Sequence, residues 1–131
     1  MTLSEEEWAA WLDRYKAAWE QRDPAMAGAL FTADAVYAET PFDPPFEGRQ
    51  AIESYWDRTV SGQKDVTFSY EPLGCRGDEG LSRWHAAFTA VPGGASVDLD
   101  GIFRCAFADS RTVRRLEEWW HVRVVPAEGS G

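Results

Sequence analysis

Large apolar side chains recur at steps of three and four residues near the start of the chain, which is the spacing of one face of an α-helix. Ser4 followed by Glu7 is a capping box, and the acidic residues around it suit the positive end of a helix. The pattern therefore predicts an amphipathic helix that continues to about Arg22. Its apolar face consists of Trp8, Trp11, Leu12, Tyr15, Ala18 and Trp19.

Two more helices are predicted within the first half of the chain. Asp23 before Pro24 caps a short helix over residues 25–31, because proline is tolerated in the first helical turn. A third helix is predicted over residues 49–61, and Gly62 ends it.

A short strand and a proline-rich elbow separate the second and third helices. The strand is predicted over residues 35–39 and the elbow over residues 41–45. Because successive strand side chains point to opposite faces, Tyr37 and Glu39 should share one face. A phenol and a carboxylate on a strand that faces an apolar helix indicate a buried polar pair, and hence a pocket.

From residue 66 onward the apolar spacing changes to every second residue, which is the period of a β-strand. Glycines in residues 74–80 indicate one turn, and Pro92-Gly93-Gly94 is a hairpin signal. Four strands are predicted, at residues 66–71, 81–91, 95–107 and 112–125.

Three early helices followed by antiparallel strands predict an α+β domain. A strongly twisted antiparallel sheet would curl around the helices as a cone and leave a cavity, a common kind of ligand site. The sequence predicts a single domain over residues 1–125, with residues 126–131 as a disordered tail.

The strand over residues 95–107 shows which of its faces should meet the core. Its apolar row is Val97, Leu99, Gly101, Phe103, Cys105 and Phe107, and Asp98, Asp100 and Arg104 occupy the other face. The strand over residues 81–91 is ambiguous, because a row with Arg83 and His85 alternates with a row of Trp84, Ala86 and Phe88. Aromatic residues on both sheet faces predict a homodimer that uses the side of Trp84, Phe88 and Trp119.

The composition argues against nucleic acid and membranes as partners and favours a cytoplasmic location. The chain has a net charge of −9, which would repel a nucleic-acid backbone. No apolar run approaches membrane-spanning length and the N-terminus lacks signal-peptide character, so a cytoplasmic protein is predicted. Cys75 and Cys105 lie in strand-like runs and are interpreted as free buried thiols. The spacing of Cys and His fits no zinc site, and no cofactor is expected.

Several positions together are similar to the nuclear transport factor 2-like superfamily. Over residues 8–124 the chain most resembles its SnoaL-like branch, which includes polyketide cyclases, ketosteroid isomerases and limonene-type epoxide hydrolases. The matching positions are Tyr15, Trp19, Asp23, Leu30-Phe31, Asp34 to Tyr37, Pro41, Gly48-Arg49, Ile52, Asp100-Gly101 and Glu117 to Trp120. This fold hosts enzymes and binding proteins alike, so the resemblance implies a fold more firmly than a function.

The epoxide hydrolase pattern implies a set of catalytic positions. That family holds a water between a Tyr and an Asn, beside an Asp-Arg-Asp set. Tyr37 falls on the Tyr and Glu39 on the Asn, while Arg83, His85 and Glu118 fall on the Arg and the two Asp. The match implies that these side chains point inward with Trp120. His for Asp and Glu for Asn depart from the pattern, so the hydrolase mechanism does not carry over intact.

The ketosteroid isomerase pattern fits a smaller part of the site. Tyr15 falls on that family's oxyanion-stabilising Tyr, and its base Asp falls on Thr40, or on Glu39 with a one-residue shift. The second oxyanion acid is replaced near Phe103, so at most half of that oxyanion hole is implied.

Two functions from different classes follow from these residues. The first is a cofactor-independent acid–base enzyme acting on a hydrophobic molecule with a carbonyl or epoxide, using Glu39 or Glu118 as base and His85 as proton shuttle. The second is a non-catalytic binding or interaction module in which Arg83 and the glutamates form a buried ion pair. The expected pocket lining is Tyr15, Trp19, Trp56, Phe68, Leu99, Phe103 and Trp120.

Overall fold

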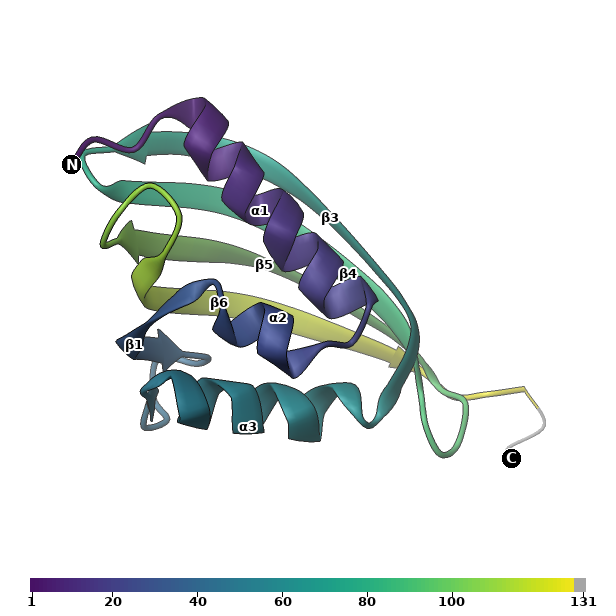
Figure 1. The fold of residues 1–131 in the computed structure, drawn as a ribbon. Coiled ribbons are helices and arrows are strands. Elements are labelled where there is room, and N and C mark those ends of the chain that lie inside the picture. Colours follow the sequence, from purple (N-terminus) through teal and green to yellow (C-terminus); the bar gives the residue numbers. More distant parts are fainter. Residues whose placement is uncertain (129–131) are drawn as a thin grey trace.

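The computed structural model describes residues 1–128 (Figure 1). Its elements are α1 (Glu5–Glu20), α2 (Pro24–Gly28), β1 (Phe31–Ala38), β2 (Phe46–Glu47), α3 (Arg49–Val60), β3 (Gln63–Arg76), β4 (Glu79–Ala90), β5 (Ser96–Phe107) and β6 (Val113–Val125). All the predicted helices and strands are present, and β3 is longer than predicted at both ends. The second helix ends at Gly28, three residues earlier than predicted, and Phe31, which was assigned to it, starts β1. The last three residues of the tail predicted at residues 126–131 lie outside the described residues.

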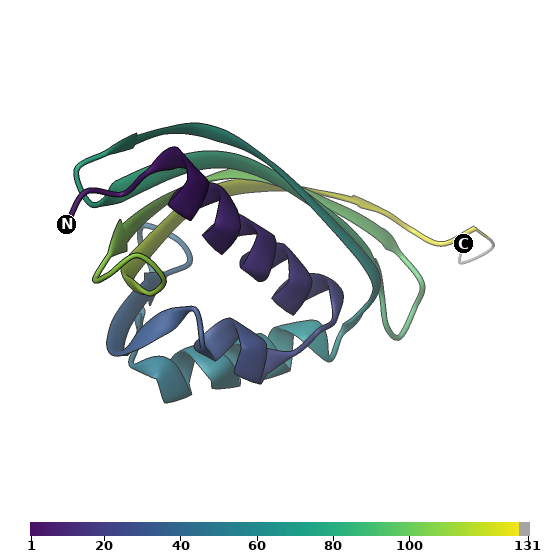
Figure 2. The ribbon, with the colours of Figure 1, turned by 45° about the horizontal axis from the view of Figure 1, so that its top comes forward.

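One curved, unclosed sheet of six strands arches over the helices (Figure 2). Its order is β2-β1-β6-β5-β4-β3, and neighbouring strands are antiparallel except for β1 and β6, which run parallel. The predicted α+β fold is therefore confirmed, with a mixed sheet in place of a purely antiparallel one. Among the described residues, no helix has the length and apolar character needed to cross a membrane.

The first helix forms and packs as its sequence predicts. The Ser4 hydroxyl accepts a hydrogen bond from the backbone of Glu7 at 3.0 Å, and the Glu7 carboxylate accepts one from the backbone of Ser4 at 2.9 Å. This capping box satisfies two backbone donors that a helix start leaves free. The six predicted apolar residues of α1 are all buried, and the helix lies across β3.

The inward face of the sheet follows the apolar row of β5. Phe103 and Cys105 are fully buried, while Ile102 and Arg104 on the other face are exposed. Both cysteines are free thiols, Cys105 buried and Cys75 partly so.

Strand β4 turns the row of Trp84 inward. This corrects the predicted inward position of Arg83 and His85 and the predicted dimer face. Trp84 and Ala86 are buried, whereas Arg83 and His85 are exposed on the outer face. The dimer face predicted to include Trp84 and Phe88 was therefore wrong in these two residues. The physical reason is that burying Trp84 removes a large apolar surface from water, whereas the alternative register would bury an arginine and a histidine.

A glycine makes room for this tryptophan. Gly101 of β5 pairs with Trp84 of β4 on one side and with Trp120 of β6 on the other. A Cβ atom at Gly101 would lie 2.9 Å from Cζ2 of Trp84, closer than real Cβ contacts come. The missing side chain therefore lets the Trp84 indole lie across the inner face of the sheet.

Candidate functional site

A cavity of about 300 Å³ that opens to solvent lies between α3 and the inner face of the sheet. This volume is at the lower end of the range for ligand pockets. Its wall is mostly aromatic and aliphatic, with two carboxylates and a few neutral polar groups. The lining residues are Tyr15, Trp19, Tyr37, Glu39, Tyr55, Trp56, Thr59, Val60, Gln63, Trp84, Phe88, Val97, Leu99, Glu118, Trp120 and Val122.

Glu118 and two tyrosines form the polar centre of the cavity. The Tyr37 hydroxyl donates to Oε1 of Glu118 at 3.0 Å, and the Tyr15 hydroxyl reaches the same oxygen at 3.5 Å. The two hydroxyl oxygens are 3.2 Å apart. Oε2 of Glu118 accepts no hydrogen bond from any residue that the structure describes, so the second carboxyl oxygen is available to a ligand.

Three separate elements bring this trio together. Tyr15 lies on the buried face of α1, Tyr37 on the inward row of β1, and Glu118 on the inward row of β6 between Leu116 and Trp120. The parallel register pairs Tyr37 with Leu116, two residues before Glu118. The pairing of the first and last strands therefore places the phenol beside the carboxyl group.

Burial dominates the electrostatics of this centre. Only 6% of Glu118 is exposed, and desolvation raises the pKa of its carboxyl group from 4.5 to about 8. The hydrogen bonds from Tyr37 and Tyr15 oppose this rise, and the nearby charge of Glu39 adds to it. Burial and the Glu118 charge also raise the pKa of both tyrosines well above 10.0. At neutral pH the Glu118 side chain is therefore mainly a neutral carboxylic acid.

Glu39 lies at the edge of the same cavity and is partly exposed. The Trp120 indole donates to its backbone oxygen at 3.0 Å, which fixes the chain just beyond β1. The Tyr55 hydroxyl interacts with the side chains of Glu39 and Thr59, and burial raises the pKa of Tyr55. The cavity thus holds two carboxyl groups in different surroundings, one deeply buried and one near solvent.

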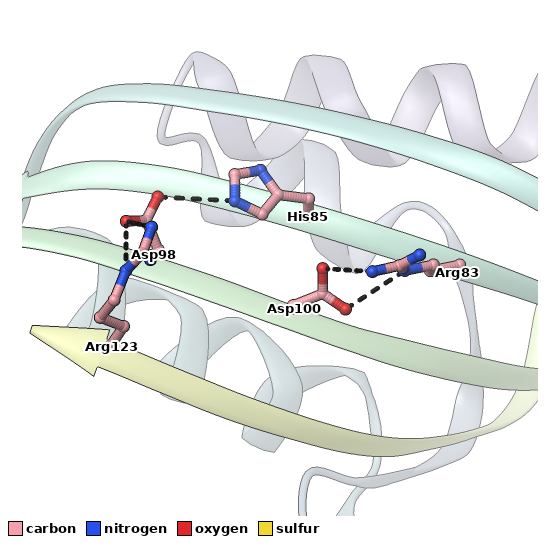
Figure 3. A network of polar contacts seen from close by, with 5 residues as sticks. All are labelled: Arg83, His85, Asp98, Asp100 and Arg123. Carbon is pink, nitrogen blue, oxygen red and sulfur yellow. Dashed lines mark hydrogen bonds and ion pairs between the residues drawn. The ribbon is translucent and has the colours of Figure 1, made fainter.

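Arg83 and His85 do not take part in this arrangement, contrary to the predicted inward register. Arg83 forms a two-point ion pair with Asp100 on the outer face, with distances of 3.0 and 3.3 Å (Figure 3). Nε2 of His85 lies 3.5 Å from Asp98 (Figure 3). The side chain of Arg83 is 60% exposed, so it reaches solvent on the face turned away from the cavity.

Five of the seven residues predicted to line the pocket do so: Tyr15, Trp19, Trp56, Leu99 and Trp120. Phe68 and Phe103 are instead part of the packed layer behind the cavity wall. Their ring centroids lie 5.3 and 4.9 Å from that of Tyr15, so they support the tyrosine and do not reach the cavity.

Several lining residues were not among the predicted site positions. Thr59 and Val60 follow Trp56 at three and four residues on the same helix face, a spacing that could have identified them. Gln63 gives no such signal, since a lone glutamine at the start of a strand is usually exposed. The others are Tyr55, Trp84, Phe88, Val97 and Val122.

Within residues 1–128, no three His, Cys, Asp or Glu side chains gather closely enough to hold a metal ion.

Comparisons with known proteins agree with this architecture. Solved structures with the same fold include SalBIII, described as an epoxide hydrolase/cyclase-like enzyme in pyran ring formation in the polyether salinomycin. It has a TM-score of 0.80 and 17% identity over 92% of this chain and 98% of its own. A putative isomerase from Bacillus subtilis has a TM-score of 0.76 and 18% identity over 88% of this chain and 87% of its own.

A third solved structure with this fold, a computationally designed 17-OHP binder, has a TM-score of 0.74 and 16% identity over 87% of this chain and 95% of its own. Identities this low show a common fold alone. No curated protein matches the chain. The model of the SnoaL-like domain matches residues 12–115, which is most of the chain. The protein therefore belongs to the SnoaL-like domain family.

Proposed function

We propose that the protein is an acid–base enzyme in which Glu118 delivers a proton to a carbonyl or epoxide oxygen of a hydrophobic organic substrate. The observation that carries the proposal is a carboxyl group with a pKa of about 8 in a mostly apolar cavity that contains a second carboxylate. An acid with a pKa near the working pH is suited to proton transfer. The hydrophobic wall selects apolar ligands.

The proposed step uses groups that are already in place. Tyr37 and Tyr15 hold Oε1 of Glu118, which leaves Oε2 to carry the proton towards the cavity. As the substrate oxygen takes this proton, its C–O bond to the epoxide carbon breaks, or its carbonyl carbon becomes electrophilic. For an epoxide, the attacking hydroxyl or water forms a new bond to that carbon while Glu39 takes its proton, and exchange of one proton with solvent then restores both glutamates. For an enone, Glu39 takes a proton from the carbon next to the carbonyl and returns it to another carbon of the resulting dienol, while Glu118 takes back its own proton. The tyrosine hydroxyls stabilise the resulting Glu118 carboxylate.

The structural neighbours support this class of chemistry. SalBIII is described as epoxide hydrolase/cyclase-like, and the Bacillus subtilis protein as a putative isomerase. Ring closure on an epoxide, epoxide hydrolysis and isomerisation of an enone each need an acid at oxygen and a base elsewhere. The pair Glu118 and Glu39 supplies both roles without a cofactor.

The test compares E118Q with E117Q on a panel of hydrophobic epoxides and cyclic enones. Glu117 is adjacent but lies on the outer face of β6, 3.5 Å from Arg115, so E117Q is a matched control. We expect E118Q to lose kcat/KM by about 100-fold or more, and E117Q to keep it. The wild-type kcat/KM should fall as pH rises through about 8. At pH 7 the wild type should show the infrared band of a protonated carboxyl group, and E118Q should lack it. If E118Q kept this band, the buried acid would not be Glu118.

The alternative function is non-catalytic binding of a hydrophobic ligand. The shared fold of a designed 17-OHP binder favours it, because that protein uses the same architecture to hold a molecule. Saturable binding with no turnover of any panel compound, at an affinity that is the same in wild type and E118Q, would favour this alternative.

We also propose a homodimer through the outer sheet face. Ile102 and Trp119 are paired across β5 and β6, and both are substantially exposed there, at 40% and 45%. Sedimentation analysis of W119E should show monomers where the wild type is dimeric. F42E is the control, because Phe42 is exposed in the loop between β1 and β2 and is not part of a strand. The cytoplasmic location remains a prediction from the sequence.

A further inference from the structure

The cavity has a second polar group, which comes from the start of β3. Gln63 lines the cavity and is only 4% exposed, although glutamine is usually a surface residue. Its backbone oxygen accepts a hydrogen bond from Arg22 at 2.7 Å, which fixes the position of the main chain. A buried polar side chain held in this way must be satisfied by a partner or by a ligand.

Trp19 determines which end of the Gln63 amide faces the cavity. The indole nitrogen of Trp19 lies 2.8 Å from the amide oxygen of Gln63. Because an indole N–H can only donate, the atom that meets it must be the oxygen, and the orientation of the amide is defined. The NH₂ group, a double donor, is then turned away from Trp19.

The amide nitrogen of Gln63 has no hydrogen-bond partner among residues 1–128. Two side-chain polar atoms of the described residues have neither accessible surface nor a hydrogen-bond partner, and they are the indole nitrogens of Trp56 and Trp84. The amide nitrogen of Gln63 is not one of them. The nitrogen of Gln63 therefore keeps accessible surface, and for a side chain buried in the cavity wall this surface faces the cavity. It is a donor that only a ligand or a water can satisfy.

Gln63 and Glu118 reach the cavity from different strands. Gln63 pairs with Ala90 of β4, whereas Glu118 is in the cross-strand row of Phe103 and Ser82. The Gln63 and Glu118 side chains are separated by about one turn of α1, because Trp19 contacts Gln63, Tyr15 contacts Glu118, and the two ring centroids are 6.1 Å apart. Aromatic and aliphatic side chains line the space between them, among them Trp56, Trp84 and Leu99.

We propose that Gln63 determines substrate specificity by donating a hydrogen bond to an acceptor oxygen at the far end of the ligand. The substrate class is then a hydrophobic molecule with two oxygen functions, one for Glu118 and one carbonyl, ether or hydroxyl oxygen for Gln63. This inference rests on the proposed function, since it assumes that the reacting oxygen binds at Glu118.

The experiment uses two phenol probes. One has an acetyl group on the ring carbon opposite the hydroxyl, and the other has an ethyl group of similar size in its place. Binding is followed by quenching of the cavity tryptophans. The wild type should bind the acetyl probe about tenfold more tightly, which is about 1.4 kcal/mol and is typical of one buried hydrogen bond.

Two variants of Gln63 and one control test whether the amide causes the preference for the acetyl probe. Q63M removes the donor, and Q63E keeps an acceptor for Trp19 but replaces the NH₂ group with an oxygen. Both should lose the preference for the acetyl probe while still binding the ethyl probe. Q50M is the control, because Gln50 is exposed on α3. The ratio of the two affinities within each folded variant is the readout, so a loss of stability does not imitate the result.

The outcomes separate this inference from the proposed function. Equal binding of both probes by the wild type, or a preference that persists in Q63M and Q63E, would overturn the role of Gln63 and leave the role of Glu118 intact. Binding of neither probe would count against the cavity as a ligand site, and both proposals would fall. E118Q should weaken both probes and keep the preference for the acetyl compound.

Discussion

The raised pKa of Glu118 makes a prediction about folding that needs no substrate. The folded protein holds the Glu118 proton up to about pH 8, whereas the unfolded chain releases it near its ordinary pKa of 4.5. Between these values the folded state binds more protons than the unfolded state, so the free energy of unfolding must fall as the pH rises. The full displacement corresponds to roughly 5 kcal/mol at about 1.4 kcal/mol per pH unit.

The variant E118Q removes this cost because an amide does not ionise, and it keeps an oxygen to which Tyr37 can donate. Relative to wild type, E118Q should become more stable as the pH rises, with the difference growing by at least about 2 kcal/mol between pH 5 and pH 8. The direction matters, because removal of a stabilising ionised carboxylate would give the opposite trend.

Urea unfolding followed by tryptophan fluorescence at several pH values measures this difference directly. E117Q, on the outer face, controls for the general effect of removing a glutamate. A difference between E118Q and wild type that stays constant from pH 5 to pH 8 would refute the reasoning, because Glu118 would then have the same pKa in both states.

Three further predictions concern single residues around the cavity. Y37F removes a hydrogen bond that lowers the Glu118 pKa, so the decline of stability should begin at the same pH but continue above pH 8, as measured by the same urea series. G101A places a methyl group against Trp84 and the backbone of β6, and should cost about 1–3 kcal/mol in urea unfolding; an unchanged midpoint would show that the strands can separate freely. R83Q should leave ligand affinity and kcat/KM unchanged, because Arg83 is on the outer face; a large loss of either would return it to the site.

The helices and the outline of the sheet could be read from the chain because local patterns determine them. The capping box at Ser4 and the apolar spacing of α1 are complete within one segment, and both appear as predicted. The parallel pairing of β1 with β6 could not be read in this way. It joins segments far apart in the chain, and no local pattern distinguishes it from an antiparallel neighbour.

The site was only partly predictable for a related physical reason. Tyr37, Glu39 and Glu118 line the cavity, the first two as the strand period predicts and Glu118 as the resemblance to epoxide hydrolases implies. Strand β4 has aromatic residues on one face and charged residues with small ones on the other, and the resemblance to epoxide hydrolases favoured the wrong face for Arg83. Gln63 was missed because its burial depends on the indole of Trp19, which comes from another element.

The contact of Tyr15 with Glu118 joins residues 103 positions apart, one near each end of the chain. In the unfolded chain these two residues are far apart, so residue 118 is an ordinary solvated glutamate. Its raised pKa arises only in the folded domain, where β6 lies between β1 and β5 and the carboxyl group is buried against the two tyrosines. A chain with α1 undocked would expose Glu118 to water and return its pKa towards the ordinary value, so the protonated state of this carboxyl group near neutral pH depends on the whole fold.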